Sequence, residues 1–311
     1  MTTLSIEELR VQYQLHDKTI HAVDRVSFSL ENNESLGIVG ESACGKSTLG
    51  FAIIRSVQGG KIVGGDILLD GKSTLKISEE EFAKTIRWKK ISIIFQGAMN
   101  SLDPVFSIKQ QFEEILRAHS HSGDRLKMIN DAIDSVGLPS TVLDKFPHEL
   151  SGGMKQRVVI AMALILRPNL VIADEPTTAL DVLVQAQILS LLKKLKKEGM
   201  TLMLISHDLG IISEIADKVG IMYAGKIVEF GTLQEVYSNP RHPYTQALLK
   251  SMPKIKGETE LISLKGNPPN LANIPAGCRF YDRCPHAMEK CRKEPPKIKT
   301  ESGHVLCWLY E

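Results

Sequence analysis

The first 80 residues show a short-period alternation of apolar and polar side chains. The segments SFSL at 27–30 and DILLD at 66–70 follow the two-residue period that is typical of half-buried strands. Between them lies a strand-like run, SLGIVG at 35–40. The pattern therefore predicts that β-strands dominate the first quarter of the chain.

The hydrophobic period becomes helical from about residue 97 to about residue 167. Ser107 and Gln110 have the spacing of a capping box ahead of an apolar face. A second helix is expected to end at Val136, because Gly137 favours the left-handed conformation that closes helices. This stretch is predicted to form a helical subdomain.

Short apolar strands return in the second half of the chain. Two are expected at 170–173 and 202–205, and a helix of about residues 182–198 separates them. Strands alternating with helices at this spacing are typical of a parallel sheet covered by helices. The predicted fold class is therefore α/β.

Composition changes after a hairpin turn expected at Ala224 and Gly225, because prolines gather in the last quarter of the chain. We expect a first domain over 1–235 and a second over 236–311. The second has too few long apolar runs for a conventional core, so a bound metal is an attractive way to stabilise it.

The overall composition narrows the functional classes. The chain has 311 residues, of which 43% are hydrophobic, and 38 Lys and Arg residues face 36 Asp and Glu residues. A near-neutral charge argues against a protein that coats nucleic acid or acidic lipid, so no nucleic-acid partner is expected.

Two further features suggest where the chain works. The first ten residues lack a basic segment followed by an apolar block, so no secretory signal is expected. The longest apolar run, 158–166, is far shorter than the ~20 residues of a membrane-crossing helix. We therefore expect a cytosolic chain whose cysteines are thiols or metal ligands.

The strongest motif is GESACGKST at 40–48, which fits the pattern G-x-x-x-x-G-K-[ST] between an expected strand and an expected helix. In such a loop, backbone N–H groups surround phosphate oxygens, the lysine reaches the β and γ phosphates, and the following hydroxyl ligates Mg²⁺. A chance glycine-rich turn is the alternative. The candidate nucleotide-binding residues are Gly40, Glu41, Ser42, Ala43, Cys44, Gly45, Lys46, Ser47 and Thr48.

A second element is an apolar strand that ends in two acids, Asp174 and Glu175. This is the form of a Mg²⁺-binding acid followed by an acid that activates water. Capping of the next helix or pairing with a lysine would explain the same residues. Beside a phosphate loop the catalytic interpretation is favoured.

The segment LSGGMKQR at 150–157 precedes a long apolar helix, so Ser151, Gly152 and Gly153 form a candidate second anion site at its positive end. Ser151 would also serve as a simple N-cap. With this segment the sequence resembles the ATPase subunits of ABC (ATP-binding cassette) transporters, although Met154 replaces the more common glutamine.

Other motifs of that family follow in the expected order. They are Gln96 in a Q-loop, the D-loop Ala179-Leu180-Asp181 with Asp181 as a nucleotide-binding candidate, and His207 as the switch histidine. The resemblance implies a P-loop NTPase ABC cassette, with a RecA-like parallel sheet core, an antiparallel β subdomain and a helical subdomain.

The resemblance also implies how the site works. Two cassettes pair head to tail, so that the signature segment of one closes over ATP held by the phosphate loop of the other. Glu175 polarises the attacking water and His207 contacts the γ-phosphate. Asp174, Ser47 and Gln96 arrange Mg²⁺, and Gln96 also senses the membrane partner.

Two positions within the cassette invite closer interpretation. Family members stack adenine on an upstream aromatic residue, and Tyr13 is the candidate, although a core tyrosine would look the same. A thiol at Cys44, beside Lys46 at a helix N-terminus, would have a lowered pKa and react readily. Alternatively, Cys44 is a small residue of which only the backbone matters.

The tail narrows the family. Four cysteines follow the pattern C-x5-C-P-x5-C-x15-C, and with NPRHPYT at 239–245 they resemble the oligopeptide/dipeptide-importer branch. The resemblance implies a [4Fe–4S] cluster, while Zn²⁺ or buried free cysteines stay alternatives. Because these cysteines lie outside every nucleotide motif, a structural role is expected, with redox sensing as the alternative. His286 and His304 lie nearby as spare ligands, and the favoured interpretation is that they are bystanders. The candidate ligands are Cys278, Cys284, Cys291 and Cys307.

Together these features predict the ATP-hydrolysing subunit of an importer of di- and oligopeptides, bound peripherally to the cytoplasmic face of the membrane. Its implied partners are two permease subunits, a solute-binding protein and a second, different ATPase. Import of oligosaccharides or nickel is the alternative within the branch. A soluble ABC ATPase and a cluster-carrying scaffold are the alternatives outside it.

Overall fold

The fold is taken from a computed structural model of the chain. The chain divides into a first unit, residues 1–74 with 204–311, and a second unit, residues 75–203. The structure describes residues 2–15, 17–97, 101–121, 123–178, 180–251 and 266–311.

The first unit contains an antiparallel sheet with the strand order β2-β1-β4-β5. Along β1, Leu4, Ile6, Leu9 and Val11 are buried, and register shifts after Ile6 keep the apolar side chains on the inner face. The predicted early strands are therefore confirmed. Their bounds are β1 Thr2–Leu15, β2 Lys18–Glu31, β4 Gly60–Leu69 and β5 Lys72–Ser73.

Five strands of the same unit belong to a second, larger sheet, in which they follow the order β11-β12-β10-β9-β3. Strand β3 is buried along its whole length and runs parallel to β9, while the other pairs are antiparallel. The turn between β9 and β10 has φ of 46° at Ala224 and 87° at Gly225, which confirms the predicted hairpin. The bounds are β3 Ser35–Val39, β9 Lys218–Tyr223, β10 Lys226–Thr232, β11 Lys297–Lys299 and β12 His304–Leu306.

The C-terminal segment thus contributes two strands to the sheet that contains β3, and it belongs to the first unit. The boundary predicted near residue 235 stays a prediction. The tail also forms short 3₁₀ turns, at Tyr281–Arg283, Glu289–Arg292 and Trp308–Tyr310.

The helices of the first unit flank this sheet. Helix α7 packs directly on β3, where a Cβ atom on Gly37 would lie 2.3 Å from Cγ2 of Ile212. Glycine at this position therefore sets the distance between helix and sheet. The bounds are α1 Lys46–Ile53, α7 Leu209–Ile215, α8 Leu233–Ser238 and α9 Pro243–Lys250.

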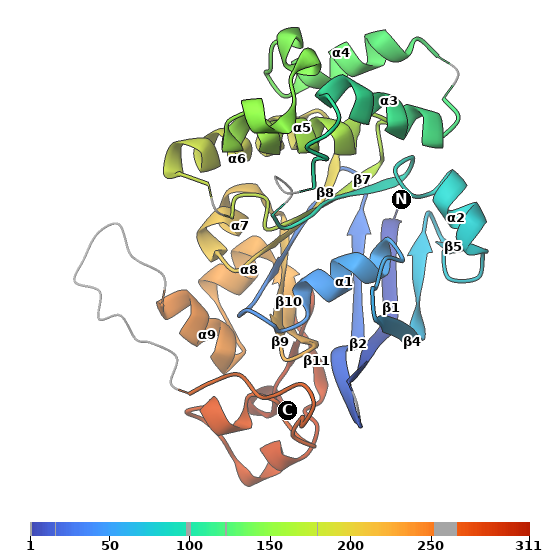
Figure 1. The fold of residues 1–311 in the computed structure, drawn as a ribbon. Helices are drawn as coiled ribbons and strands as arrows, with labels where there is room; N and C mark the ends of the chain where they lie inside the picture. The colour runs from blue at the N-terminus through green and yellow to red at the C-terminus, as the bar shows by residue number, and fades with distance from the viewer. Residues whose placement is uncertain (1, 16, 98–100, 122, 179, 252–265) are drawn as a thin grey trace. The chain divides into compact units, whose positions relative to one another are not determined.

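The second unit contains the predicted helical stretch. Helices α3, α4 and α5 pack against one another (Figure 1), and strands β6 and β7 are parallel. Gln110 N–H donates to Ser107 Oγ at 3.3 Å and Ser107 N–H to Gln110 Oε1 at 2.8 Å, which confirms the capping box. Gly137 has a φ of 70° just after α4, as expected.

The elements of the second unit are α2 Glu79–Thr85, β6 Ile91–Ile94, α3 Ile108–Ala118, α4 Arg125–Ser135, the 3₁₀ turns Ser140–Asp144 and Pro147–Glu149, α5 Gly152–Leu164, β7 Leu170–Asp174 and α6 Val182–Lys197. Strand β8, Thr201–Ser206, runs across the division between the units. The strands predicted at 170–173 and 202–205 and the helix between them are confirmed.

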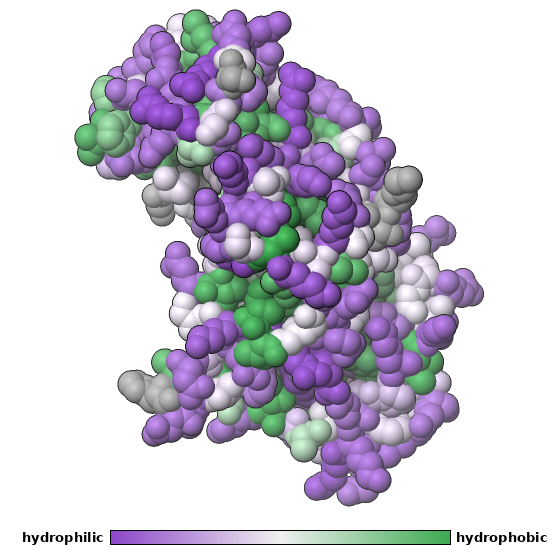
Figure 2. Space-filling view, turned by 90° about the vertical axis from the view of Figure 1, so that its right-hand side faces the viewer, coloured by the Kyte–Doolittle hydropathy of each residue, from purple (hydrophilic) through white to green (hydrophobic). Residues whose placement is uncertain are grey.

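Within the part of the chain that the structure describes, none of the helices combines the length and the apolar character that a membrane crossing requires. Hydrophilic side chains cover most of the face drawn in Figure 2, with smaller hydrophobic patches between them.

Candidate nucleotide-binding site

The phosphate loop connects β3 to α1, as the motif requires. Ala43 and Gly45 have φ of 61° and 106°, so the backbone turns back before the helix begins at Lys46. The Gly225 N–H donates to the Cys44 carbonyl at 2.8 Å and fixes the loop against the β9–β10 turn. A loop of this form at the N-terminus of a helix is suited to binding an anion.

Lys46 is only 5% exposed, and its ammonium group is held by the loop itself. Its Nζ donates to the Gly40 carbonyl at 2.8 Å and to the Glu41 carbonyl at 2.9 Å. The ammonium therefore lies within the loop, beside the first two residues of the motif. This position agrees with the predicted phosphate contact, which stays a prediction.

Tyr13 lies beside the last residue of the motif. Its hydroxyl is 3.3 Å from Thr48 Oγ1, and its half-buried ring packs against Gly60, where a Cβ atom would lie 2.7 Å from Cε1. The structure therefore brings Tyr13 to the phosphate loop, although stacking on adenine stays a prediction.

Cys44 differs from one of the interpretations offered for it. The thiol is 3% exposed, and burial raises its pKa although the Lys46 ammonium acts in the opposite direction. The expected lowered pKa is therefore wrong, because desolvation of the thiolate outweighs the nearby positive charge, and the burial no longer favours ready reactivity. The other interpretation, a small side chain of which only the backbone matters, agrees with the structure.

In the second unit, two predicted site residues, Gln96 and Glu175, are in contact just after β7 ends. Glu175 follows the fully buried Asp174, and its Oε2 accepts hydrogen bonds from Gln96 Nε2 at 3.0 Å and from Thr178 Oγ1 at 2.9 Å. Glu175 has a φ of 45°, a conformation that is uncommon for residues other than glycine and that directs the chain sharply away from the end of the strand. Sequence reasoning missed Thr178, and the hydroxyls that follow the two acids were the available signal.

The signature segment begins helix α5. Ser151 Oγ accepts the Met154 N–H at 3.3 Å, so the N-cap interpretation is confirmed. Gly153 allows close packing, since a Cβ atom there would lie 2.8 Å from Val184 Cγ1. With Ser151 and Gly152 exposed at the positive end of the helix, the proposed second anion site stays a prediction.

Asp181 caps the next helix, α6, by accepting the Val184 N–H at 2.9 Å. Ala179 of the D-loop lies outside the described residues. In the first unit, His207 follows β8 directly and is exposed, while Asp208 caps α7 by accepting the Gly210 N–H at 2.7 Å. The roles given to Asp181 and His207 stay predictions.

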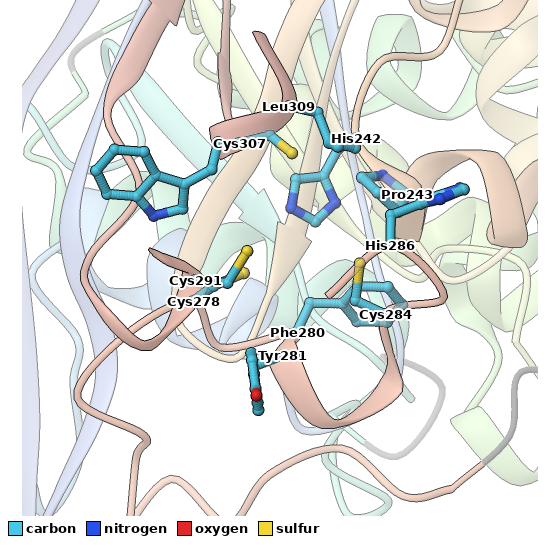
Figure 3. Close-up of a pocket in the computed structure, with 11 residues that line it drawn as sticks. His242, Pro243, Cys278, Phe280, Tyr281, Cys284, His286, Cys291, Cys307 and Leu309 are labelled. Carbon is cyan, nitrogen blue, oxygen red and sulfur yellow. The ribbon is translucent and has the colours of Figure 1, made fainter. Parts of the chain in front are cut away.

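The four tail cysteines line one pocket of the first unit, which His242 and His286 also line, and in Figure 3 the sulfur atoms turn towards a common space. Burial raises the pKa of Cys278 to about 11 and lowers the pKa of His242 to about 3. His304 stacks on Phe230 instead, as expected of a bystander, whereas His286 lies at the pocket.

This donor set has the chemistry of a thiolate site, but its geometry is incomplete. Among the described residues, no three His, Cys, Asp or Glu side chains are grouped as a metal ion would require. Four soft ligands at one pocket fit a metal or cluster in type. The structure gives no coordination shell.

The tail also contacts the phosphate loop, which sequence reasoning missed. The Glu41 N–H donates to the Tyr244 hydroxyl at 2.9 Å, and the Arg283 guanidinium pairs with the Glu41 carboxylate at 2.7 Å. The motifs were interpreted separately, and their spacing contains no signal for this contact.

Comparison with known protein families gives two matches. Residues 23–178 match the ABC transporter family, and residues 228–291 match the C-terminal region of oligopeptide/dipeptide transporters. The chain is 42% identical to a dipeptide transport ATP-binding protein of Caldanaerobacter subterraneus, over 99% of this chain and 97% of that protein. It is 44% identical to an oligopeptide transport ATP-binding protein of Salmonella typhimurium, over 97% and 92% respectively.

Solved structures agree with the fold. A dimeric ATP-binding cassette with bound ADP and phosphate superimposes with a TM-score of 0.65 at 27% identity, covering 74% of this chain and 98% of that one. A cassette of Clostridium perfringens, part of an ABC transporter complex, gives a TM-score of 0.64 at 29% identity, with coverage of 76% and 91%. The predicted cassette fold is confirmed.

One assignment agrees with all of these findings: the phosphate loop, the hydrogen bond between Gln96 and Glu175, the signature segment that caps a helix, and relatives that match nearly the whole chain. The chain belongs to the ABC transporter family, as an ATP-binding and ATP-hydrolysing subunit of its oligopeptide/dipeptide branch.

Proposed function

We propose that this chain binds ATP with Mg²⁺ and hydrolyses it to drive the import of di- and oligopeptides. The observation that carries the proposal is the likeness to dipeptide and oligopeptide transport ATP-binding proteins, which extends over nearly the whole chain, tail included. Oligosaccharides and nickel stay alternative cargoes.

In the reaction, a water molecule attacks the γ-phosphorus of ATP. The bond between the γ-phosphorus and the oxygen that bridges the β and γ phosphates breaks, which yields ADP and phosphate. Glu175 orients this water and receives its proton, and Gln96 and Thr178 hold the carboxylate in place. Lys46 binds the β and γ phosphates, and His207 contacts the γ-phosphate.

Mg²⁺, when bound, neutralises charge on the phosphates, and Ser47, Gln96 and Asp174 are the residues that would hold it. Two hydroxyl or amide groups and one carboxylate suit this hard cation, which prefers oxygen ligands. The full burial of Asp174 supports its assignment, since an acid in that position is commonly balanced by a cation.

The partners follow from the same family. We infer two transmembrane permeases, a solute-binding protein and a second cassette that differs from this one. The second cassette would present two elements to the ATP that is bound by this chain. One is its own signature segment, which corresponds to Ser151, Gly152 and Gly153, and the other is its counterpart of Asp181. The subunit would then lie peripherally on the cytoplasmic face of the membrane.

A [4Fe–4S] cluster held by the four tail cysteines is part of this proposal, with Zn²⁺ as the alternative. Convergence of four thiols at one pocket supports it, and a bound group would have to draw them closer together. Elemental analysis and visible absorption of anaerobically purified protein distinguish iron with sulfide from zinc. Cys44→Ser is the control for the measured iron, sulfide and zinc contents, because it removes a cysteine that lies outside the tail.

Affinity purification from native membranes, followed by mass spectrometry, tests the assignment to an importer. Recovery of two permeases, a second cassette and a solute-binding protein is expected, and ligand screening of that binding protein identifies peptide, sugar or nickel. Recovery of ribosomes or DNA-repair factors alone would contradict the transport function. In the purified complex, Glu175→Gln should keep its partners but lose ATP hydrolysis.

A further inference from the structure

Glu41, the second residue of the phosphate loop, is held by two side chains from the C-terminal tail. Arg283 makes a bidentate pair with its carboxylate, from Nη1 to Oε2 at 2.7 Å and from Nη2 to Oε1 at 2.9 Å. The Glu41 N–H donates to the hydroxyl of the fully buried Tyr244 at 2.9 Å. All three residues belong to the first unit.

The ion pair is well placed to hold the loop. The Arg283 side chain is 5% exposed and the Glu41 side chain 25%, so water screens the pair poorly. Fork-to-fork pairs of this kind fix orientation as well as distance. Because Lys46 donates to the carbonyl of the same Glu41, the position of Glu41 also affects where the lysine ammonium lies.

Glu41 also presents an electrostatic problem that Arg283 solves. A carboxylate in a loop that takes up a triphosphate repels the ligand, and the repulsion is strong where water is scarce. Pairing with a guanidinium, which is always charged, neutralises that carboxylate. Removal of Arg283 would therefore loosen the loop and also expose the incoming phosphates to a negative charge.

Arg283 is fixed in turn by the wall of the thiol pocket. It ends the 3₁₀ turn Tyr281–Arg283 and immediately precedes Cys284. Its guanidinium donates to the Tyr223 hydroxyl at 3.2 Å and lies 5.9 Å from the ring centre of Phe280, a residue that lines the pocket with Cys278. The Phe280 and Tyr223 rings pack edge to face with centroids 5.3 Å apart.

We propose that Arg283 is a positioning residue for ATP binding, which fixes the phosphate loop through Glu41 and transmits the packing of the four-cysteine pocket to that loop. The inference rests on the proposed binding of ATP at the loop. It goes further in making the tail, which contains none of the nucleotide motifs, a determinant of nucleotide affinity.

The test measures affinity of the full-length chain for Mg²⁺-ATP by titration calorimetry, together with thermal unfolding. Arg283→Met is expected to bind about tenfold more weakly, a change of about 1.4 kcal/mol. Arg283→Lys, which keeps the charge but not the fork, should fall between that variant and the wild type. If Arg283→Met does not fold, Arg283→Lys carries the test.

Glu294→Gln is the matched control. Glu294 also ties the tail to earlier strands of the first unit, through Arg25 of β2 and Lys226 of β10. Among the hydrogen bonds that the structure describes, Glu294 has no contact with the loop. The control should lower the unfolding temperature but leave ATP affinity within twofold of the wild type. Equal weakening by Glu294→Gln and Arg283→Met, or no weakening by Arg283→Met, would overturn the inference.

Transmission from the pocket is tested by a double-mutant cycle. Cys284→Ser should weaken ATP binding in the wild-type background and have little further effect in the Arg283→Met background. Additive effects would refute the coupling. A wild-type chain that binds no ATP, alone or in its complex, would instead count against the proposed function itself, so the two failures are distinguishable.

Discussion

Replacement of Gly45 by alanine separates two reasons why the phosphate loop needs glycine. Gly45 has a φ of 106°, which an L residue adopts at a cost of about 1–2 kcal/mol. In addition, a Cβ atom would lie 2.0 Å from the Ala22 carbonyl oxygen and 2.8 Å from Met222 Cε, whereas ordinary contact begins at 3.4 Å. The clash adds about 1–3 kcal/mol, the usual cost of overpacking.

Gly71→Ala is the matched control. Gly71 also has a positive φ, of 75°, yet a Cβ atom there would meet nothing within 4 Å. The control therefore reports the backbone cost alone. For a unit of this size, with about 2–4 °C lost per kcal/mol, we expect Gly71→Ala to lower the unfolding temperature by about 4 °C and Gly45→Ala by about 10 °C.

The two variants should differ more in ATP binding than in stability. Strand β2, which contains Ala22, is paired along its length with β1, so the loop yields more easily than the strand. We expect Gly45→Ala to bind Mg²⁺-ATP at least about tenfold more weakly, by titration calorimetry, and Gly71→Ala to bind normally. Equal unfolding temperatures together with equal affinities would refute the steric argument.

Three further predictions concern single side chains. In the assembled complex, Glu175→Gln should lower ATP hydrolysis by about 100-fold or more, as phosphate release reports, while ATP binding persists. Burial alone would raise the pKa of Glu294, but hydrogen bonds from Arg25 and Lys226 outweigh it and lower that pKa to about 2. The contribution of Glu294 to folding stability is therefore present above pH 4.5, its ordinary pKa, and is lost as the pH falls to about 2. When the free energy of unfolding is measured over this pH range, Glu294→Gln should lose less stability than the wild type. Cys44 of the native chain should react slowly with a maleimide, followed by intact mass, and rapidly after urea unfolding.

Features that depend on near neighbours were predictable from the sequence. The capping box of Ser107 and Gln110 and the turn at Ala224 and Gly225 each need only a few consecutive residues, whose side chains or φ values decide the local structure. The phosphate loop was predictable for the same reason, since Gly45 and its flanking strand and helix lie within one short segment.

Features that depend on burial or on distant contacts were not predictable. The interpretation of Cys44 as reactive used its neighbour in sequence, Lys46, but not the desolvation that residues far along the chain impose. Likewise Arg283 and Glu41 are separated by 242 positions, and neither residue type nor spacing indicates that they pair. Only the folded first unit brings them together.

That pairing bears on why the tail accompanies the cassette. A glutamate in a triphosphate-binding loop weakens ligand binding by itself, because its carboxylate repels the phosphates. The carboxylate also needs a cation nearby when water is excluded. Within Glu41, Lys46 donates only to the backbone carbonyl, and the ion pair described for the Glu41 carboxylate comes from Arg283 of the tail. The tail also supplies the buried hydroxyl of Tyr244 to the Glu41 N–H. The loop and the tail are therefore joined by direct contacts within the first unit, although they match two separate family regions. A cassette with Glu41 at this position should depend on its tail for ATP affinity as well as for stability.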